Sequence, residues 1–243
     1  MDERLKEIVD HFETMKIGLD ETFRFHCTMC GKCCINREDI LLSPKDIYGI
    51  SKELGIKPEK MFEQYCEVYI GPDSKVPVVR LKPRGSVKRC PLLKNRKCMV
   101  HKAKPTVCAM FPLGRCIVAA NPEEGLKDIS KGQFQYIFNN PGCGDASETH
   151  TAREYLESFG IPVEDNFFIK WQQTVLEMGN IFRKLEKTVS NETMELVWRA
   201  AFIGLYLHYE TEKDFMPQFD SNVKNFFDML HSVFPEGGDK TVT

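Results

Sequence analysis

Four cysteines crowd into positions 27 to 34, in the pattern Cys-x2-Cys-x2-Cys-Cys. Such an x2-x2 run lets one tight loop turn three sulfurs toward a common centre, as in iron–sulfur proteins. Cys-x2-Cys units also hold structural zinc. Gly31 lies inside the run, where the chain must bend sharply. The pattern therefore predicts that thiolates bind a metal, and it leaves the identity of the metal open.

The last two of these cysteines, Cys33 and Cys34, are neighbours in the chain. Neighbouring side chains generally diverge, so the pair is poorly placed to share one tetrahedral ion. In two-cluster ferredoxins a local run gives three ligands to one cluster while the next cysteine serves the other. Cys33 could complete the local trio while Cys34 serves a second centre. The alternative is a single centre, with Cys34 as a small buried hydrophobic residue.

A second group of cysteines lies in the segment "RCPLLKNRKCMVHKAKPTVCAMFP". Cys90 is followed by proline, as in the bacterial ferredoxin run. Lys104-Pro105 predicts the start of a short helix that presents Cys108 one turn later. His101 follows Cys98 at x2 spacing and is either an imidazole ligand or a packing residue. The second reading is favoured because four-thiolate sites need no histidine.

Three cysteines lie outside these two groups. Cys143 is flanked by glycines, so its backbone can approach another group closely. Cys66 lies on a helical apolar pattern and is interpreted as a core residue, and Cys116 has no setting that suggests a ligand. Of the ten cysteines, eight are therefore candidate metal ligands: Cys27, Cys30, Cys33, Cys34, Cys90, Cys98, Cys108 and Cys143.

The chain start, "MDERLKEIVD", is charged and amphipathic, unlike a signal peptide, and no apolar run approaches the roughly 18 residues that span a bilayer. The expected location is therefore the cytoplasm, with no membrane partner. Thiols stay reduced in that compartment, so the cysteines favour metal binding or catalysis over disulfides.

Short elements are expected around the cysteines. Residues 2–16 have apolar side chains at helical spacing, which predicts a helix. Ser43 and Pro44 are suited to cap and begin a helix that Gly55 ends. A second helix is expected from "KPEKMFEQYC", and strands are expected from "VPVVRL", "CIVAA" and "QFQYIF". Pro77 restricts the first strand to an edge or to a strand start.

After about residue 148 the chain has no cysteine and shows four helical patterns: "SETHTAREYLESFG", "NFFIKWQQTVLEMGNIFRKLEKTV", "NETMELVWRAAFIGLYLHYE" and "FDSNVKNFFDMLHSVF". The predicted fold class is α+β, with an irregular cysteine-rich module of short helices and strands before a helical C-terminal region. The expected segments are an N-terminal helix over 1–22, the metal-binding module over 23–147 and the helical region over 148–235.

A basic block contains the distal cysteines. Residues 74–122 have twelve Lys or Arg and no Asp or Glu, whereas the whole chain has 33 basic and 35 acidic residues, so the remainder has 21 against 35. Cations near thiolates favour their ionised form. The surplus cations either receive an anionic partner or form a solvated basic face, and the second is favoured. No aromatic residue lies between Ser74 and Met110, which argues against nucleic acid as a partner.

No nucleotide fingerprint, phosphate loop, HExxH motif or nucleophile elbow occurs, so the sequence does not decide whether the chain is an enzyme. His26 adjoins Cys27 and could hydrogen-bond its sulfur. The histidines outside the distal group stand alone and are interpreted as structural: His11, His26, His150, His208 and His231.

The order CxxCGxCC, "LLSPKDIYGISKELGI", Cys-Pro, "CMVHKAKPTVCAMFP" and Gly-Cys-Gly resembles the putative zinc- or iron-chelating CxxCxxCC family, the YkgJ-type cysteine cluster proteins. The resemblance covers residues 23–147. It implies that the eight candidate cysteines are the family's cysteine positions. Position 101 is often tyrosine in the family, which argues further against His101 as an obligatory ligand. Flagellin lysine N-methylases resemble the family distantly but are longer chains.

The predicted function is a metal-binding cysteine cluster protein with one or two thiolate-ligated centres. An iron–sulfur cluster of the [4Fe-4S] type is favoured, with a redox role or a cluster-dependent modification, and Zn²⁺ is the alternative metal. The alternative function is a zinc-stabilised, non-catalytic interaction module. A third is protein lysine N-methyltransferase-like activity, implied by the resemblance alone. The helical region is expected to serve an unknown protein partner or substrate.

Overall fold

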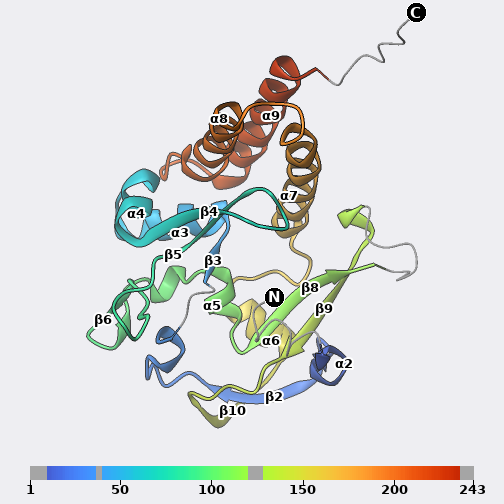
Figure 1. The fold of residues 1–243 in the computed structure, drawn as a ribbon. Coiled ribbons are helices and arrows are strands. Elements are labelled where there is room, and N and C mark those ends of the chain that lie inside the picture. The colour runs from blue at the N-terminus through green and yellow to red at the C-terminus, as the bar shows by residue number, and fades with distance from the viewer. Residues whose placement is uncertain (1–9, 37–39, 120–127, 236–243) are drawn as a thin grey trace, which may run out of the picture. The chain divides into compact units, whose positions relative to one another are not determined.

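The computed structural model describes residues 10–36, 40–119 and 128–235 (Figure 1). The chain packs as two compact units, each built from stretches that are separate in the sequence. Unit 1 comprises Met1–Ile40 and Leu81–Gln173, and unit 2 comprises Leu41–Arg80 and Thr174–Thr243. Both combine helices with small antiparallel sheets, so the predicted α+β class is confirmed. The division into three segments that the sequence predicts, over residues 1–22, 23–147 and 148–235, remains a prediction.

The described residues of unit 1 form two antiparallel sheets and a hairpin. One sheet pairs β2 (Thr22–His26) with β10 (Asp145–Thr151), which run side by side in Figure 1. The other has the order β1 (Lys16–Ile17), β9 (Gln133–Phe138), β8 (Leu113–Val118). β6 (Leu93–Lys94) and β7 (Lys97–Cys98) form the hairpin. The short helices are α2 (Phe12–Met15), η1 (Lys32–Cys34), η2 (His101–Ala103), α5 (Thr106–Met110), η3 (Ile129–Lys131) and α6 (Ala152–Ser158).

Two of the strands expected from the sequence fall in this unit. The strand expected from "QFQYIF" is confirmed as β9, whereas β8 contains only the first three residues of "CIVAA", whose last residue lies outside the described residues. The expected N-terminal helix lies partly outside the described residues, and α2 is the part that the structure describes. One expectation is wrong. The segment from Ser147 to Gly160 is not helical throughout, because β10 continues to Thr151 and α6 begins only after it. Thr151 caps α6 through a capping box with Glu154, which fixes the helix start at that residue.

The core of unit 1 forms where the two sheets meet α5 and α6. Phe23 and Phe25 alternate with exposed residues along β2, so one face of the strand is buried. Tyr155 packs its ring edge-on against Phe23, with the ring centroids 5.3 Å apart, and its hydroxyl donates to the carbonyl of Phe111 at 2.7 Å. The core consists of Ile17, Phe23, Phe25, Ala109, Met110, Leu113, Tyr136, Ala152, Tyr155, Leu156 and Ile161.

Unit 2 combines a three-stranded sheet with helices. The sheet has the order β3 (Leu41–Leu42), β5 (Pro77–Leu81), β4 (Cys66–Ile70). Pro77 therefore begins a central strand, one of the two positions that the sequence allows. The helices are α3 (Pro44–Leu54), α4 (Pro58–Tyr65), α8 (Asn191–Phe202), the π-helical η4 (Ile203–Leu207), α9 (Phe215–Val233) and α7 (Asn166–Leu185), whose first residues belong to unit 1. None of the helices in the described part of the chain is long and apolar enough to cross a membrane.

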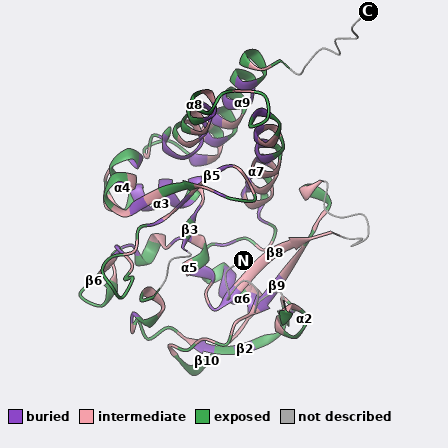
Figure 2. Cartoon of the chain, in the orientation of Figure 1, coloured by how far each residue is buried: buried purple, intermediate pink, exposed green. Residues whose placement is uncertain are grey.

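The core of unit 2 lies between these helices and the sheet (Figure 2). Phe182 of α7 is fully buried and meets Phe226 of α9 edge-on, with the ring centroids 6.4 Å apart. Trp198 of α8 donates its indole N–H to the carbonyl of Lys75 at 3.0 Å. The aromatic residues that recur at helical spacing therefore serve packing.

The start of α3 is fixed by a capping box at Ser43, the residue that the sequence predicts as the cap. The Ser43 hydroxyl accepts from the Asp46 amide at 3.2 Å, and the Asp46 carboxylate accepts from the Ser43 amide at 2.8 Å. Pro44 occupies the first helical position, and Gly55 ends the helix with φ 63°. Replacement of Ser43 by alanine leaves one helical N–H without this partner. We expect Ser43→Ala to lower the free energy of unfolding by about 1 kcal/mol in urea titrations, and Ser43→Asn to lower it less.

Candidate metal centre

The eight cysteines chosen from the sequence line a single cavity of about 90 Å³ in unit 1. Cys27 is exposed and the other seven are half-buried. The wall also carries the apolar side chains of Leu92 and Phe111 and the cationic side chains of Arg96 and Lys104. The fold thus brings together sulfurs that lie up to 116 positions apart in the sequence, from Cys27 to Cys143.

The first cysteines follow directly after the end of β2. The loop turns at Gly31, which has φ 74° as the sequence predicts, and then forms the 3₁₀ turn η1. The amide of Cys34 donates to the carbonyl of Gly31 at 3.0 Å, which closes this turn. Four thiols are therefore presented by one short stretch of chain.

Cys33 and Cys34 both lie in η1, and their sulfurs are 3.9 Å apart. The expectation that these neighbours diverge is therefore wrong for the sulfur atoms, because the tight turn holds them close. The pKa of Cys33 is raised by its hydrogen bond with Cys34 and by burial. The hydrogen bond with Cys33 lowers the pKa of Cys34, but hydrogen bonding to Cys90 and burial outweigh it and raise that pKa to about 11.

Cys143 reaches the same loop through the start of β10. Gly144 has φ 71°, and a Cβ atom at this position would collide with the carbonyl oxygen of His26. The close backbone approach expected of the Gly-Cys-Gly segment is confirmed. Hydrogen bonds from the backbone of Lys32 and of Gly144 lower the pKa of Cys30. Burial, together with the neighbouring thiols, raises the pKa of Cys143 to about 11.

The distal cysteines are held by backbone contacts around the β6–β7 hairpin. The amide of Cys90 donates to the carbonyl of Cys34 at 2.8 Å, and the amide of Leu93 donates to the carbonyl of Cys90 at 3.2 Å. Cys98 pairs with Leu93 across the hairpin. The hairpin turns at two residues with positive φ, as two-residue loops favour: Asn95 and Arg96.

Cys108 is presented by α5, which begins directly after Pro105. This confirms the helix predicted from Lys104-Pro105. His101 lies in η2, is exposed, and lines the same cavity. Partial burial and the positive charge of Lys104 lower the pKa of His101. Its two interpretations, as a ligand or as a packing residue, both remain compatible with this position.

The two remaining cysteines lie away from the cavity. Cys66 is only 5 % exposed, and its sulfur is 3.6 Å from that of Met61. The prediction that it belongs to the core is confirmed. Cys116 lies on β8, where its thiol donates to the carbonyl of Gln135 at 3.8 Å.

Burial raises the pKa of the Cys66 thiol to about 12. A raised pKa favours the neutral thiol, and only the thiolate is a nucleophile. At pH 8 the thiolate fraction is about a thousandfold lower than for a thiol at its ordinary value of 9.0. We therefore expect iodoacetamide to leave Cys66 unmodified in the native protein and to modify it fully in urea, as peptide mass spectrometry would show. Rapid native labelling would contradict the buried position.

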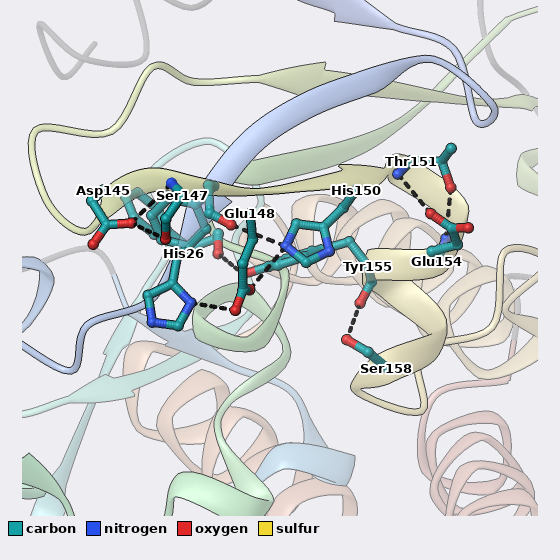
Figure 3. Close-up of polar contacts among 11 residues, drawn as sticks. His26, Asp145, Ser147, Glu148, His150, Thr151, Glu154, Tyr155 and Ser158 are labelled. Carbon is teal, nitrogen blue, oxygen red and sulfur yellow. Dashed lines mark hydrogen bonds and ion pairs between the residues drawn. The ribbon is translucent and has the colours of Figure 1, made fainter.

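Sequence reasoning missed a polar cluster beside the cysteine loop, in which Glu148 lies between two histidines (Figure 3). One carboxylate oxygen is 2.6 Å from Nδ1 of His26, and the other is 3.3 Å from Nε2 of His150. Nε2 of His150 also lies 3.0 Å from the carbonyl of Phe25. These two histidines therefore do not stand alone. Glu148 and His150 are two residues apart on β10, a spacing that places side chains on one face of a strand.

The donors fit a thiophilic metal by their chemistry. Thiolates are soft ligands that select zinc and iron–sulfur clusters. Among the described residues, no three His, Cys, Asp or Glu side chains are arranged as ligands of one ion. Ligation therefore requires cysteine side chains to rotate toward a common point, which their staggered rotamers permit. The cavity gives them the space to do so.

The comparisons with known proteins gave one match. The model of the family described as CxxCxxCC, a putative zinc- or iron-chelating domain, matches residues 26–138. The matched range contains seven of the eight cysteines that line the cavity, and Cys143 follows it. No curated protein and no solved structure matches the chain.

Proposed function

We propose that the protein binds metal through the thiols of its cavity, with an iron–sulfur cluster as the bound group. The proposal is supported by the match of residues 26–138 to the model of the putative zinc- or iron-chelating CxxCxxCC family. The observation that carries the proposal is the convergence of eight thiols on one cavity. Thiols that serve packing have no need to gather in this way. Cys66 and Cys116 are examples, because each lies away from the cavity and contacts other groups of the protein.

Two features favour an iron–sulfur cluster over a single zinc ion. The x2-x2 run with its Gly31 turn and the Cys90-Pro91 step both resemble ferredoxin ligation. The cavity of about 90 Å³ is several times the space that one water molecule needs, whereas structural zinc sites are closed around the ion. A bound cluster would supply one-electron redox chemistry.

The residues of this chain contribute the environment of such a group. Hydrogen bonds from the backbone of Lys32 and Gly144 favour the ionised form of Cys30. Lys104 and Arg96 add positive charge to the cavity wall, which offsets the negative charge of several thiolates. Leu92 is 1 % exposed and excludes water from one side.

Anaerobic purification with elemental analysis tests the proposal. We expect a brown protein that contains iron and acid-labile sulfide and loses its visible absorption on reduction. Cys90→Ser is expected to lose metal, whereas Cys66→Ser and Cys116→Ser are expected to keep the wild-type content. Equal loss from Cys66→Ser would show that the metal is not in this cavity. A folded wild-type protein without any metal would refute the proposal.

The alternative is a zinc-stabilised interaction module, in which the metal contributes folding energy and no chemistry. A colourless protein with stoichiometric zinc in the same experiment would select it, since thiolate sites suit both metals. Lysine N-methyltransferase-like activity, the third function considered, rests on the sequence resemblance alone.

A further inference from the structure

The eight thiols of the cavity outnumber the ligands of any one simple centre. A tetrahedral zinc site and a [4Fe-4S] cluster each take four thiolates. A single centre would leave four thiols of the same cavity unligated. The number of thiols therefore raises the question of how many metal centres they bind and which thiols belong to each centre.

The distance between Cys33 and Cys34 does not answer this question. Their sulfurs are 3.9 Å apart, and two thiolates on one tetrahedral zinc ion lie about 3.8 Å apart when each Zn–S bond is about 2.3 Å. By distance alone the two could share an ion. The other neighbours of each sulfur must decide.

The neighbours of Cys33 come from the loop after β2 and from the start of β10. The Cys30 sulfur accepts from the Gly144 amide, and Gly144 packs on the carbonyl of His26, so the β2–β10 pairing brings Cys143 to this loop. Cys33, Cys30 and Cys27 all contribute to the raised pKa of Cys143, so each is close enough to act on its thiol. Four thiols thus gather on this side of η1.

The neighbours of Cys34 come from the hairpin and from α5. Its carbonyl accepts from the amide of Cys90 at 2.8 Å, and its thiol is hydrogen-bonded to that of Cys90. Cys98 and Cys108 both act electrostatically on Cys90. Cys33 and Cys27 act electrostatically on Cys98 as well. Cys98 is assigned to this side because its hairpin is tied to Cys90 through the Leu93 amide, and because it acts on both Cys34 and Cys90.

We propose that the cavity holds two four-thiolate metal centres, and that the two adjacent cysteines of η1 belong to different centres. The first centre takes Cys27, Cys30, Cys33 and Cys143, and the second takes Cys34, Cys90, Cys98 and Cys108. This inference rests on the proposed metal binding and adds the number of centres and their ligands. The 3.9 Å between Cys33 and Cys34 makes the two centres close neighbours.

Metal content per chain tests the number of centres on the wild-type protein alone. Anaerobically purified protein should contain two zinc ions, or the iron and sulfide of two [4Fe-4S] clusters. Half of that amount, in a folded protein, would overturn the two-centre inference and leave the proposed metal binding intact. No metal at all would refute both.

Paired variants test the division of the ligands. Cys143→Ser should remove one centre, and Cys108→Ser should remove the other, so each keeps half of the metal. The double variant Cys27→Ser with Cys143→Ser should also keep half, whereas Cys143→Ser with Cys108→Ser should keep none. Cys66→Ser is the matched control and should keep all. Far-UV circular dichroism checks that each variant is folded.

Two results would overturn the division. One is the loss of all metal from either single variant in a folded protein, which would indicate one bridged centre. The other is equal metal loss from the two double variants, which would show that the groups are drawn incorrectly. If a Cys143 variant fails to fold, Cys27→Ser takes its place, because Cys27 is exposed. If the metal is iron, the electron paramagnetic resonance spectra of the two reduced single variants should add up to the spectrum of the reduced wild type. The only difference should be the features that spin coupling between the two clusters adds to the wild-type spectrum.

Discussion

Removal of the metal from the wild-type protein is expected to raise amide hydrogen exchange in residues 82–104 by more than tenfold. A tenfold change corresponds to about 1.4 kcal/mol of lost local stability. The effect should be confined to this segment and to the loop of residues 27–36, which together present six of the eight cavity thiols.

The reason is the charge of the segment. Residues 82–104 carry nine Lys or Arg and no Asp or Glu. Only Pro91, Leu92 and Val100 are buried among them, so apolar contacts contribute little to holding the segment. Metal-bound thiolates would supply negative charge at Cys90 and Cys98, inside the segment itself. Without the metal these thiols can protonate, and the repulsion between the cations is then opposed by less negative charge.

Mass spectrometry of exchange before and after chelation under reducing, anaerobic conditions would measure the effect. The paired strands Leu113–Val118 and Gln133–Phe138 belong to the same unit and present no cavity thiol, so their exchange serves as the internal control. Higher salt should reduce the difference, because it screens repulsion between exposed charges. Exchange that rises equally in the control strands would indicate global unfolding and would contradict the local explanation.

The cysteines that line the cavity could be chosen from the sequence because their spacing is a local property. The x2-x2 run, the glycines around Cys143 and the proline before α5 each act within a few residues, and the structure places all eight chosen cysteines in one cavity. The same holds for the capping box of Ser43. These features depend on the backbone preferences of residues that are close in the sequence.

The features that could not be predicted depend on pairing between distant segments. The start of the segment at Ser147 has a helical pattern, yet it forms β10 because β2 offers a strand edge across more than 120 positions. The same pairing brings Glu148 to His26. The composition of the two packing units is likewise non-local, since each joins segments from both halves of the chain. No single-sequence pattern encodes which edge a strand will meet.

A buried ion pair in unit 1 joins β8 to the start of α7. Arg115 donates from Nη2 to Oδ2 of Asp165 at 2.9 Å, and both side chains are less than a tenth exposed. The guanidinium lies 4.1 Å from the ring centroid of Phe168, and within the described residues its buried Nε has no hydrogen-bond partner. The other Asp165 oxygen accepts from the Phe168 amide at 3.0 Å, which caps the helix.

Replacement of Asp165 by alanine is expected to lower the free energy of unfolding by about 3–5 kcal/mol, because it leaves the Arg115 charge buried without its partner. Urea titrations followed by circular dichroism would measure this loss.

Asp165→Asn keeps a capping oxygen and removes only the charge, so it separates the capping role of Asp165 from its role in the ion pair. The double replacement Arg115→Met with Asp165→Leu should recover much of the loss, since an apolar pair of similar volume removes the unpaired charge. The exposed pair between Asp20 and Arg153 is the matched control, and Asp20→Ala should change the stability far less. Equal losses from Asp165→Ala and Asp20→Ala would show that burial does not set the strength of the Arg115 pair.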